Sequence, residues 1–222
     1  KQGTPGYPMF GFDAKVIKET TGEPCQANEK GMLVLAAPLP PGCLATVWRN
    51  DERFINGYFS LLDGKQYATS DYAVMDEYGY YYILGRTDDV INVAGHRLGT
   101  KEIEEAIGHH PEVAESAVVG IHDELKGELP IAFCILKNHD LVAETENRFR
   151  IEQQIVGEVA RQLGALAKPA AIYFPKALPK TRSGKILRRS IKALAEGKET
   201  GDMSTLDDPT AIEAVRQAMA DY

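Results

Sequence analysis

The sequence has few cysteines and no long apolar run, and each shortage excludes a class of protein. Only three cysteines occur among the 222 residues: Cys25, Cys43 and Cys134. They are an odd number, lie far apart and form no C-x-x-C pair, so they indicate neither a zinc site nor a disulfide framework. This usage fits a reducing compartment. No apolar run approaches the ~18 residues that a membrane-spanning helix needs.

Positive charge is also in deficit. Lysine and arginine together number 25 against 32 acidic residues, which gives a net charge of −7. This balance favours solubility and argues against nucleic acid or an anionic membrane as a partner. The segment from Lys1 to Pro8 lacks the apolar core of a signal peptide, so we expect a cytoplasmic protein. The chain begins without methionine and amid turn residues, and we expect it to be a piece of a longer protein.

The hydrophobic pattern changes near residues 86–89. Before this point the chain alternates as short strands and turns, with strands expected at 11–17, 31–37, 66–69, 72–75 and 80–84 and a short helix capped by Asp51. After it, strands expected at 116–121, 129–136 and 170–174 alternate with helices expected at 100–107, 144–163, 185–195 and 210–219. The sequence therefore predicts an α+β protein with a strand-rich part over 1–86 and a second part over 87–222.

The stretch 85–100 lies at this change and carries two arginines, two adjacent carboxylates and three glycines. Anion-binding groups at the boundary of two architectures suggest an active site that moves. Surface ion pairing is the simpler alternative for Arg86 and Arg97, because most arginines do only that. Asp71 closes an expected strand and could accept hydrogen bonds from two vicinal hydroxyls, as on a ribose. The alternative is a turn residue that caps its own backbone.

The loop 179–185 is the second informative feature. Gly184 and Lys185 could suggest a phosphate-binding P-loop, but Pro179 stands where its first glycine is needed and Ile186 follows the lysine. The loop instead presents Lys185 at the start of an expected helix. Its basic neighbours suggest a solvated basic face or a nucleic-acid surface, which the negative net charge disfavours. These neighbours are Lys176, Lys180, Arg182, Arg188, Arg189 and Lys192.

Three segments, taken together, resemble the late motifs of the short-chain acyl-CoA synthetases of the adenylate-forming superfamily. They are YATSD at 67–71, YGYYYILGRTDDVINVAGHRLGT at 78–100 and LPKTRSGKILRR at 178–189. They occur in the expected order and the resemblance covers almost the whole chain. Within this family, TGEPC at 21–25 and LPPGC at 39–43 look more like the propionyl-CoA than the acetyl-CoA synthetases. The resemblance implies the strand-rich end of a large adenylating domain followed by a small mobile α+β lid domain.

The resemblance also implies a two-step reaction. A short-chain carboxylate attacks the α-phosphate of ATP, and the thiol of CoA then attacks the acyl-adenylate and releases AMP. By analogy with the family, Asp71 and Arg86 bind the ribose and Arg97 contacts the phosphates. Ala94 and Gly95 lie where the pantetheine arm of CoA passes. Asp88 is the implied hinge, and Lys185 is the implied adenylation lysine.

Further implications concern a metal and a modification. A Mg²⁺ site built partly from backbone carbonyls would fall on Gly108, His110 and Val113, although a buried or capping histidine is the simpler explanation of His110. Acetylation would remove the charge of Lys185, which makes a lysine acetyltransferase and deacetylase possible partners. An arginine that contacts the CoA phosphate in relatives is replaced by Ala160, and the adjacent Arg161 could substitute for it.

The family's earlier motifs do not occur in this sequence. It has no Ser/Thr/Gly-rich loop for the ATP phosphates and no segment for the acyl pocket, so the N-terminal domain of the same enzyme is an expected partner. We expect this piece alone to be inactive. The alternatives are a piece of an acetyl-CoA synthetase, another adenylating enzyme such as a fatty acyl ligase, or a non-catalytic binding or acetyltransferase-substrate module. A nucleic-acid binder that uses the basic helix is a further alternative.

Overall fold

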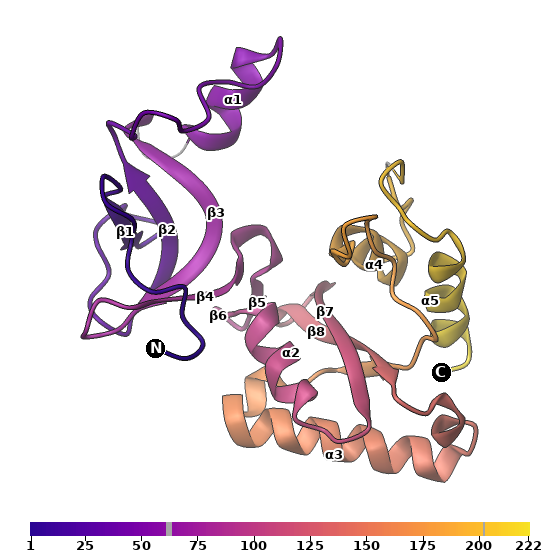
Figure 1. Cartoon of the computed structure of the whole chain (residues 1–222). Coiled ribbons are helices and arrows are strands. Elements are labelled where there is room, and N and C mark those ends of the chain that lie inside the picture. The colour runs from indigo at the N-terminus through magenta and orange to yellow at the C-terminus, as the bar shows by residue number, and fades with distance from the viewer. Residues whose placement is uncertain (61–63, 202) are drawn as a thin grey trace. The chain divides into compact units, whose positions relative to one another are not determined.

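The computed structural model describes residues 1–60, 64–201 and 203–222 (Figure 1). The chain divides into two compact units, Lys1–Asp88 and Asp89–Tyr222. We call the first the sheet unit and the second the mixed unit. The division falls within the stretch of arginines, carboxylates and glycines at 85–100.

The sheet unit is a four-stranded antiparallel sheet whose strands follow one another in chain order. These are β1 (Ala14–Ile17), β2 (Lys30–Ala36), β3 (Gln66–Met75) and β4 (Tyr81–Arg86), with helix α1 (Asp51–Tyr58) between β2 and β3. The sequence predicted two short strands where the structure has the single strand β3. Register shifts opposite Leu33 and after Tyr72, together with a left-handed Ser70 (φ 64°), bend this strand. Its pairing with β2 and β4 continues on both sides of the bend, so it remains one strand.

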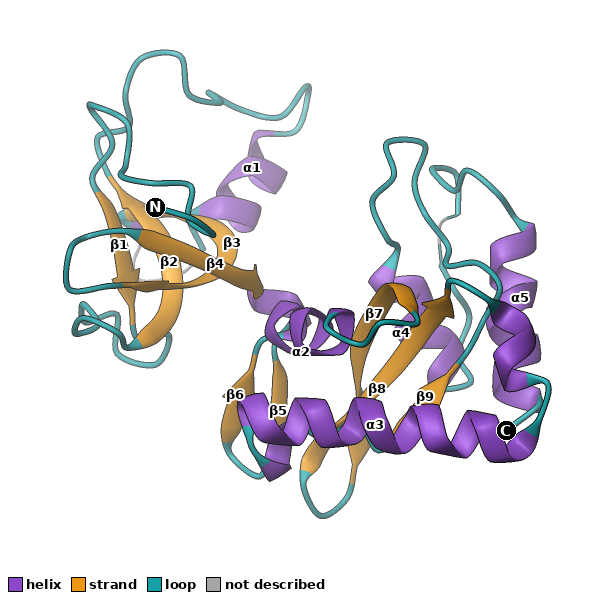
Figure 2. Ribbon diagram, turned by 60° about the horizontal axis from the view of Figure 1, so that its bottom comes forward, coloured by secondary structure: helices purple, strands orange, loops and turns teal. Residues whose placement is uncertain are grey.

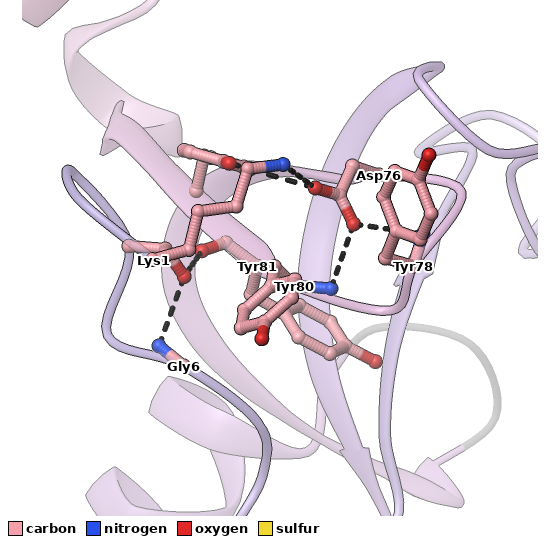
Figure 3. Close-up of polar contacts among 8 residues, drawn as sticks. Lys1, Gly6, Asp76, Tyr78, Tyr80 and Tyr81 are labelled. Carbon is pink, nitrogen blue, oxygen red and sulfur yellow. Dashed lines mark hydrogen bonds and ion pairs between the residues drawn. The ribbon is translucent and has the colours of Figure 1, made fainter.

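The turn between β3 and β4 is held by a nearly buried carboxylate (Figure 3). Asp76 accepts the backbone N–H of Tyr80 at 2.9 Å and pairs with the Lys1 ammonium. The hydroxyl of the buried Tyr81 donates to the carbonyl of Ala14 at 2.7 Å. The bond to Tyr80 closes the turn locally, whereas the contacts of Lys1 and Tyr81 join this region to distant parts of the sheet unit.

The mixed unit has five strands and four helices among its described residues. The strands are β5 (Ile91–Val93), β6 (His96–Leu98), β7 (Val113–Asp123), β8 (Gly127–Leu136) and β9 (Ala171–Tyr173). The helices are α2 (Thr100–Gly108), α3 (Thr145–Leu163), α4 (Arg188–Ala195) and α5 (Thr210–Ala220). Short 3₁₀ turns occupy Thr87–Asp89 at the boundary of the units, His139–Val142 and Ala165–Ala167. The strand order is β6-β5-β8-β7, and β9 pairs parallel to β8.

Alternation along β7 and β8 gives the mixed sheet two covered faces. Val118 and Ala132 point into one core with the buried faces of α2 and α3. Ala117 and Phe133, one residue away on each strand, point into a second core with α4 and α5. Figure 2 shows helices on both sides of this sheet. The period of two along each strand therefore decides which helices each side chain meets.

Several expected boundaries were wrong. Helix α4 begins at Arg188, so Lys185 lies in a loop rather than at a helix start. Asn50, not Asp51, caps α1, since its side chain accepts the N–H of Arg53. Gly99, not Thr100, precedes α2 as its N-cap. The β5–β6 hairpin was not expected, because its strands have only three residues each and show too little alternation to detect.

None of the helices within the described ranges is both long enough and apolar enough to cross a bilayer.

Candidate functional site

The two residues assigned to the ribose lie opposite each other in the sheet unit. Asp71 on β3 and Arg86 on β4 are direct partners in the antiparallel register. Directly opposed residues place their Cβ atoms roughly 4.5–5.5 Å apart on the same face. Asp71 lies inside a strand that bends beside it at Ser70, so the alternative of a turn residue does not describe its place. The sheet thus brings together two of the predicted site residues.

Arg86 also pairs with the expected hinge residue. Its Nε donates to Asp88 Oδ1 at 3.3 Å, and both side chains are about half exposed. An exposed pair of this kind contributes little stability. The pair therefore leaves both groups able to exchange partners when a ligand arrives. Asp88 itself lies in the 3₁₀ turn at which the two units divide.

Ala94 and Gly95 form the two-residue turn between β5 and β6. Both have positive φ angles, 49° and 83°, as a type I′ hairpin turn requires. The N–H of Ala94 donates to the carbonyl of Lys126 at 2.7 Å, which ties the turn to the loop before β8. A Cβ on Gly95 would meet no atom within 4 Å. The backbone angle rather than crowding therefore favours glycine, and the turn has open space beside it.

Arg97 lies on β6 of the same hairpin, opposite Asn92 on β5. Its Nε atom is buried, although the residue as a whole is partly exposed. The hairpin shows that Arg97 shares a two-stranded ribbon with the Ala94–Gly95 turn, which the sequence alone did not indicate.

The loop of Lys185 is closed by its own backbone. The N–H of Thr181 donates to the carbonyl of Lys185 at 2.8 Å, and the N–H of Lys185 donates to Thr181 Oγ1 at 3.1 Å. Gly184, with φ of 81°, makes the turn between them. The Lys185 side chain is exposed and makes no hydrogen bond or ion pair with the described part of the chain. The loop therefore holds the backbone of Lys185 while leaving its ammonium available to an anion.

The basic residues around this loop are largely engaged within the mixed unit. Lys180 pairs with Glu115 at 2.7 Å, Arg188 with Glu104 at 2.7 Å and Lys192 with Glu128 at 2.8 Å. Half-buried guanidinium and ammonium groups with internal carboxylate partners are poorly placed to neutralise nucleic-acid phosphates. The pairs weaken the reading of this segment as a nucleic-acid surface.

The chain is similar to several known proteins. Residues 102–185 match the family of the AMP-binding enzyme C-terminal domain. The mixed unit contains an AMP-binding enzyme C-terminal domain. Over 98% of its length the chain is 53% identical to a propionate–CoA ligase of Salmonella typhimurium and 52% identical to one of Escherichia coli. It is 48% identical to an acetyl-coenzyme A synthetase of Pyrobaculum aerophilum. The chain spans about a third of the length of these curated relatives, 35%, 35% and 31% respectively.

Solved structures show the same fold. An acetoacetyl-CoA synthetase from Streptomyces lividans matches 99% of this chain and 32% of its own with a TM-score of 0.83 at 22% identity, which supports the fold alone. An anthranilate–CoA ligase in complex with anthranoyl-AMP matches 89% of this chain and 36% of its own, with a TM-score of 0.72 and 32% identity. The α+β fold expected from the sequence is confirmed.

The metal prediction concerns the turn after α2 in the AMP-binding C-terminal domain. The described residues contain no group of three or more His, Cys, Asp or Glu side chains able to hold a metal. Gly108, His110 and Val113 would therefore contribute backbone carbonyls, and that of His110 already accepts the N–H of Val113 at 3.1 Å. Mg²⁺ usually takes one or two carboxylates from a protein, so these groups fit it poorly. We assign no reaction step to a metal here.

The imidazole of His110 has an ordinary structural role. It is buried, with Nε2 3.1 Å from Gln154 Oε1, and its Nδ1 accepts the N–H of Glu112 at 3.3 Å. This arrangement places the ring proton on Nε2, where it donates to the amide oxygen. The ring therefore stabilises the turn that follows α2 and links this turn to Gln154 on α3.

Arg161, the expected substitute for Ala160, is already paired on α3. Two of its nitrogens donate to the carboxylate of Glu158, three residues earlier. Hydrogen bonds from Arg161 and then from Gln162 lower the pKa of Glu158 to about 2. A CoA phosphate would have to compete with this carboxylate, and contact with Arg161 stays a prediction.

Proposed function

We propose that this chain is part of a cytoplasmic, AMP-forming ligase that makes propionyl-CoA from propionate, ATP and CoA. The observation that carries the proposal is the 53% identity, over nearly the whole chain, to a propionate–CoA ligase, against 48% to an acetyl-coenzyme A synthetase. Because the chain spans 35% of that ligase, we infer that activity requires further polypeptide, which holds the ATP phosphates and the acyl pocket.

In the first proposed step, a propionate oxygen attacks the α-phosphorus of ATP and pyrophosphate leaves. Asp71 would accept hydrogen bonds from the ribose hydroxyls, with Arg86 beside it. Lys185 and Arg97 would stabilise the negative charge that gathers on the phosphoryl oxygens. A positioned cation is valuable in such a displacement because the protein supplies charge and orientation rather than covalent chemistry.

In the second proposed step, the sulfur of CoA attacks the acyl carbonyl, its proton is lost, and AMP leaves with the electrons of the acyl–phosphate bond. The open side of the Ala94–Gly95 turn suits the narrow pantetheine arm. Lys185 has no task in this step. We therefore propose that rotation at Asp88 exchanges the lysine loop for the turn between the two half-reactions, as in other enzymes whose lids complete one site at a time.

The test uses the full-length polypeptide and measures the two half-reactions separately. Lys185→Ala should lower propionate-dependent exchange of pyrophosphate into ATP by about a hundred- to a thousandfold. The same variant should still convert supplied propionyl-adenylate to propionyl-CoA. Lys198→Ala, which removes an exposed lysine paired with Glu196, is the matched control and should leave both rates unchanged.

Two outcomes would contradict these assignments. Equal loss of both half-reactions in Lys185→Ala would remove the proposed role of this lysine. A higher kcat/KM with acetate than with propionate in the unaltered enzyme would favour the acetyl-CoA synthetase alternative.

A second candidate function rests on the side chain of Lys185, which is exposed and has no partner among the residues that the structure describes. An exposed ammonium on a closed loop is accessible to a lysine acetyltransferase, and acetylation would remove the charge needed for adenylation. We propose that such a modification, reversed by a deacetylase, regulates the ligase. Mass spectrometry should find acetyl groups on Lys185 in preference to Lys198, and adenylation should fall in proportion. Acetylation without any change in adenylation would contradict this regulation.

A further inference from the structure

Helix α4 follows the Lys185 loop directly and presents two basic residues, Arg188 and Lys192, one turn apart. Residues at this spacing lie on the same face of a helix. Each pairs with a glutamate on another element, Arg188 with Glu104 on α2 and Lys192 with Glu128 on β8. These four side chains form what we call the carboxylate clamp.

Glu104 joins three elements. Its carboxylate accepts three hydrogen bonds from the guanidinium of Arg188, at 2.7, 2.9 and 3.0 Å. It also accepts the backbone N–H of Val118 on β7 at 2.9 Å. β7 is the last strand of the order β6-β5-β8-β7, so Glu104 satisfies an edge N–H and fixes the first turn of α4 at once. Burial opposes the charge of Arg188, but the hydrogen bonds and charge of Glu104 outweigh it and raise the pKa of Arg188.

Glu128 joins α4 to the other predicted site of the mixed unit. One carboxylate oxygen pairs with Lys192, and the other accepts the backbone N–H of Asn92 on β5 at 2.9 Å. Asn92 lies two residues before the Ala94–Gly95 turn. Gly120 packs beneath this contact, where a Cβ would lie 2.9 Å from Ile91 and 3.2 Å from the Glu128 carboxyl carbon. The position of Glu128 is therefore closely confined.

We propose that Glu104 and Glu128 are positioning residues that make the Lys185 loop and the Ala94–Gly95 turn parts of one rigid body. Glu104 sets the helix that the lysine loop leads into, and Glu128 ties the same helix to the turn. Lid rotation then exchanges the two sites without altering either. The proposal rests on the proposed ligase function. It also assigns a structural role to the basic face of α4, whose Arg188 and Lys192 pair with these two glutamates.

The two glutamates should have different kinetic signatures. Glu104→Gln keeps the shape of the side chain but removes the one carboxylate that is hydrogen-bonded to the half-buried guanidinium of Arg188. Its adenylation kcat should fall on the order of tenfold to a hundredfold, as small misplacements of a catalytic group typically do. Its thioester-forming rate from supplied propionyl-adenylate should stay near that of the unaltered enzyme. Glu128→Gln should lower both rates, because Glu128 holds both α4 and β5.

A matched control is available within the same unit. Glu152 pairs with Arg148 with similarly low exposure, but both lie on α3, which packs against the other face of the sheet from α4. Glu152→Gln should leave both half-reactions unchanged. Arg188→Lys keeps a positive charge without the two-pronged geometry and should fall between the unaltered enzyme and Glu104→Gln.

A second measurement tests how firmly the Lys185 loop is held, and it does not depend on catalysis. Trypsin should cleave the native full-length polypeptide after Arg182 and Lys185 several times faster in Glu104→Gln than in Glu152→Gln, because a freed α4 releases the loop. Equal cleavage rates, or proportional loss of both half-reactions with a falling folded fraction, would overturn the positioning role. Absence of propionate-dependent exchange in the unaltered enzyme would instead overturn the proposed function, while the cleavage comparison would still test the clamp.

Discussion

The sheet unit and the mixed unit are stabilised in different ways. In the mixed unit, helices cover both faces of the sheet and create two cores. The buried clusters of the sheet unit are small, one around Val16 and Tyr81 and one around Ile17 and Val34. A cavity of about 210 Å³, lined almost entirely by apolar side chains, opens beside its sheet. From this difference we infer that burial of apolar side chains dominates the stability of the mixed unit. Strand register, turns and polar contacts contribute a larger share of the stability of the sheet unit.

The largest expected effect is a core truncation in the mixed unit. Phe133 on β8 is fully buried in the core shared with α4 and α5. Phe133→Ala should lower the free energy of unfolding of this unit by about 3–5 kcal/mol. Hydrogen exchange followed by mass spectrometry should show the loss in residues 89–222 and leave residues 1–88 protected. Phe149→Ala, at an exposed position of α3, should change the free energy of unfolding little. Equal destabilisation by the two substitutions would show that burial does not dominate the stability of the mixed unit.

A smaller effect is expected from a single, partly buried hydrogen bond in the sheet unit. Tyr81→Phe removes the hydroxyl that donates to Ala14 and leaves that carbonyl without this donor. The cost should be about 1 kcal/mol. Urea unfolding monitored by exchange in residues 1–88 measures it. Tyr78→Phe, whose side chain is 67% exposed, is the control and should be neutral. A neutral Tyr81→Phe would show that the sheet unit does not depend on this contact.

Relief of backbone strain at the turn between β5 and β6 should raise stability, in contrast to the two destabilising substitutions above. Ala94 has a left-handed φ of 49°, which asparagine adopts more readily than alanine. Ala94→Asn should therefore stabilise the mixed unit by less than ~1 kcal/mol. Gly95→Ala, at φ of 83°, should destabilise it even though space is open there. Thermal unfolding of the two variants should move in opposite directions, and a shared direction would exclude backbone strain as the cause.

The smallest expected effect is a loss of stability of the sheet unit at low pH. The hydrogen bond from Lys1, followed by those from the N–H groups of Tyr80 and Tyr78, holds the pKa of Asp76 below its usual value. A carboxyl whose folded pKa is depressed adds stability above its unfolded pKa of about 3.9, and this is lost as pH falls through the folded pKa. Exchange in residues 1–88 should rise below about pH 4. Asp76→Asn should flatten that dependence, and an unchanged pH profile would assign the acid sensitivity to other carboxyls.

Several elements were predictable because their signals are local. The long helix α3 ends before Gly164, as its apolar spacing and the terminal glycine indicated. Strand β8 was expected from its run of apolar residues. The hairpin β5–β6 was not predicted, because a three-residue strand has no period to detect. The start of α4 at Arg188 was not predicted either, and this residue is bonded to Glu104, 84 positions earlier, which no local pattern reveals.

The sequence by itself determined the α+β class, the family resemblance and the chemical types at the candidate site. Motifs and hydrophobic periods are properties of neighbouring residues and can be read without a fold. Only the tertiary structure decided that Asp71 faces Arg86, that Ala94 and Gly95 form a turn with positive φ angles, and that Glu104 and Glu128 hold α4. Apart from the turn, these contacts join residues far apart in the chain, and their free energy exists only once the packed core has brought those residues together.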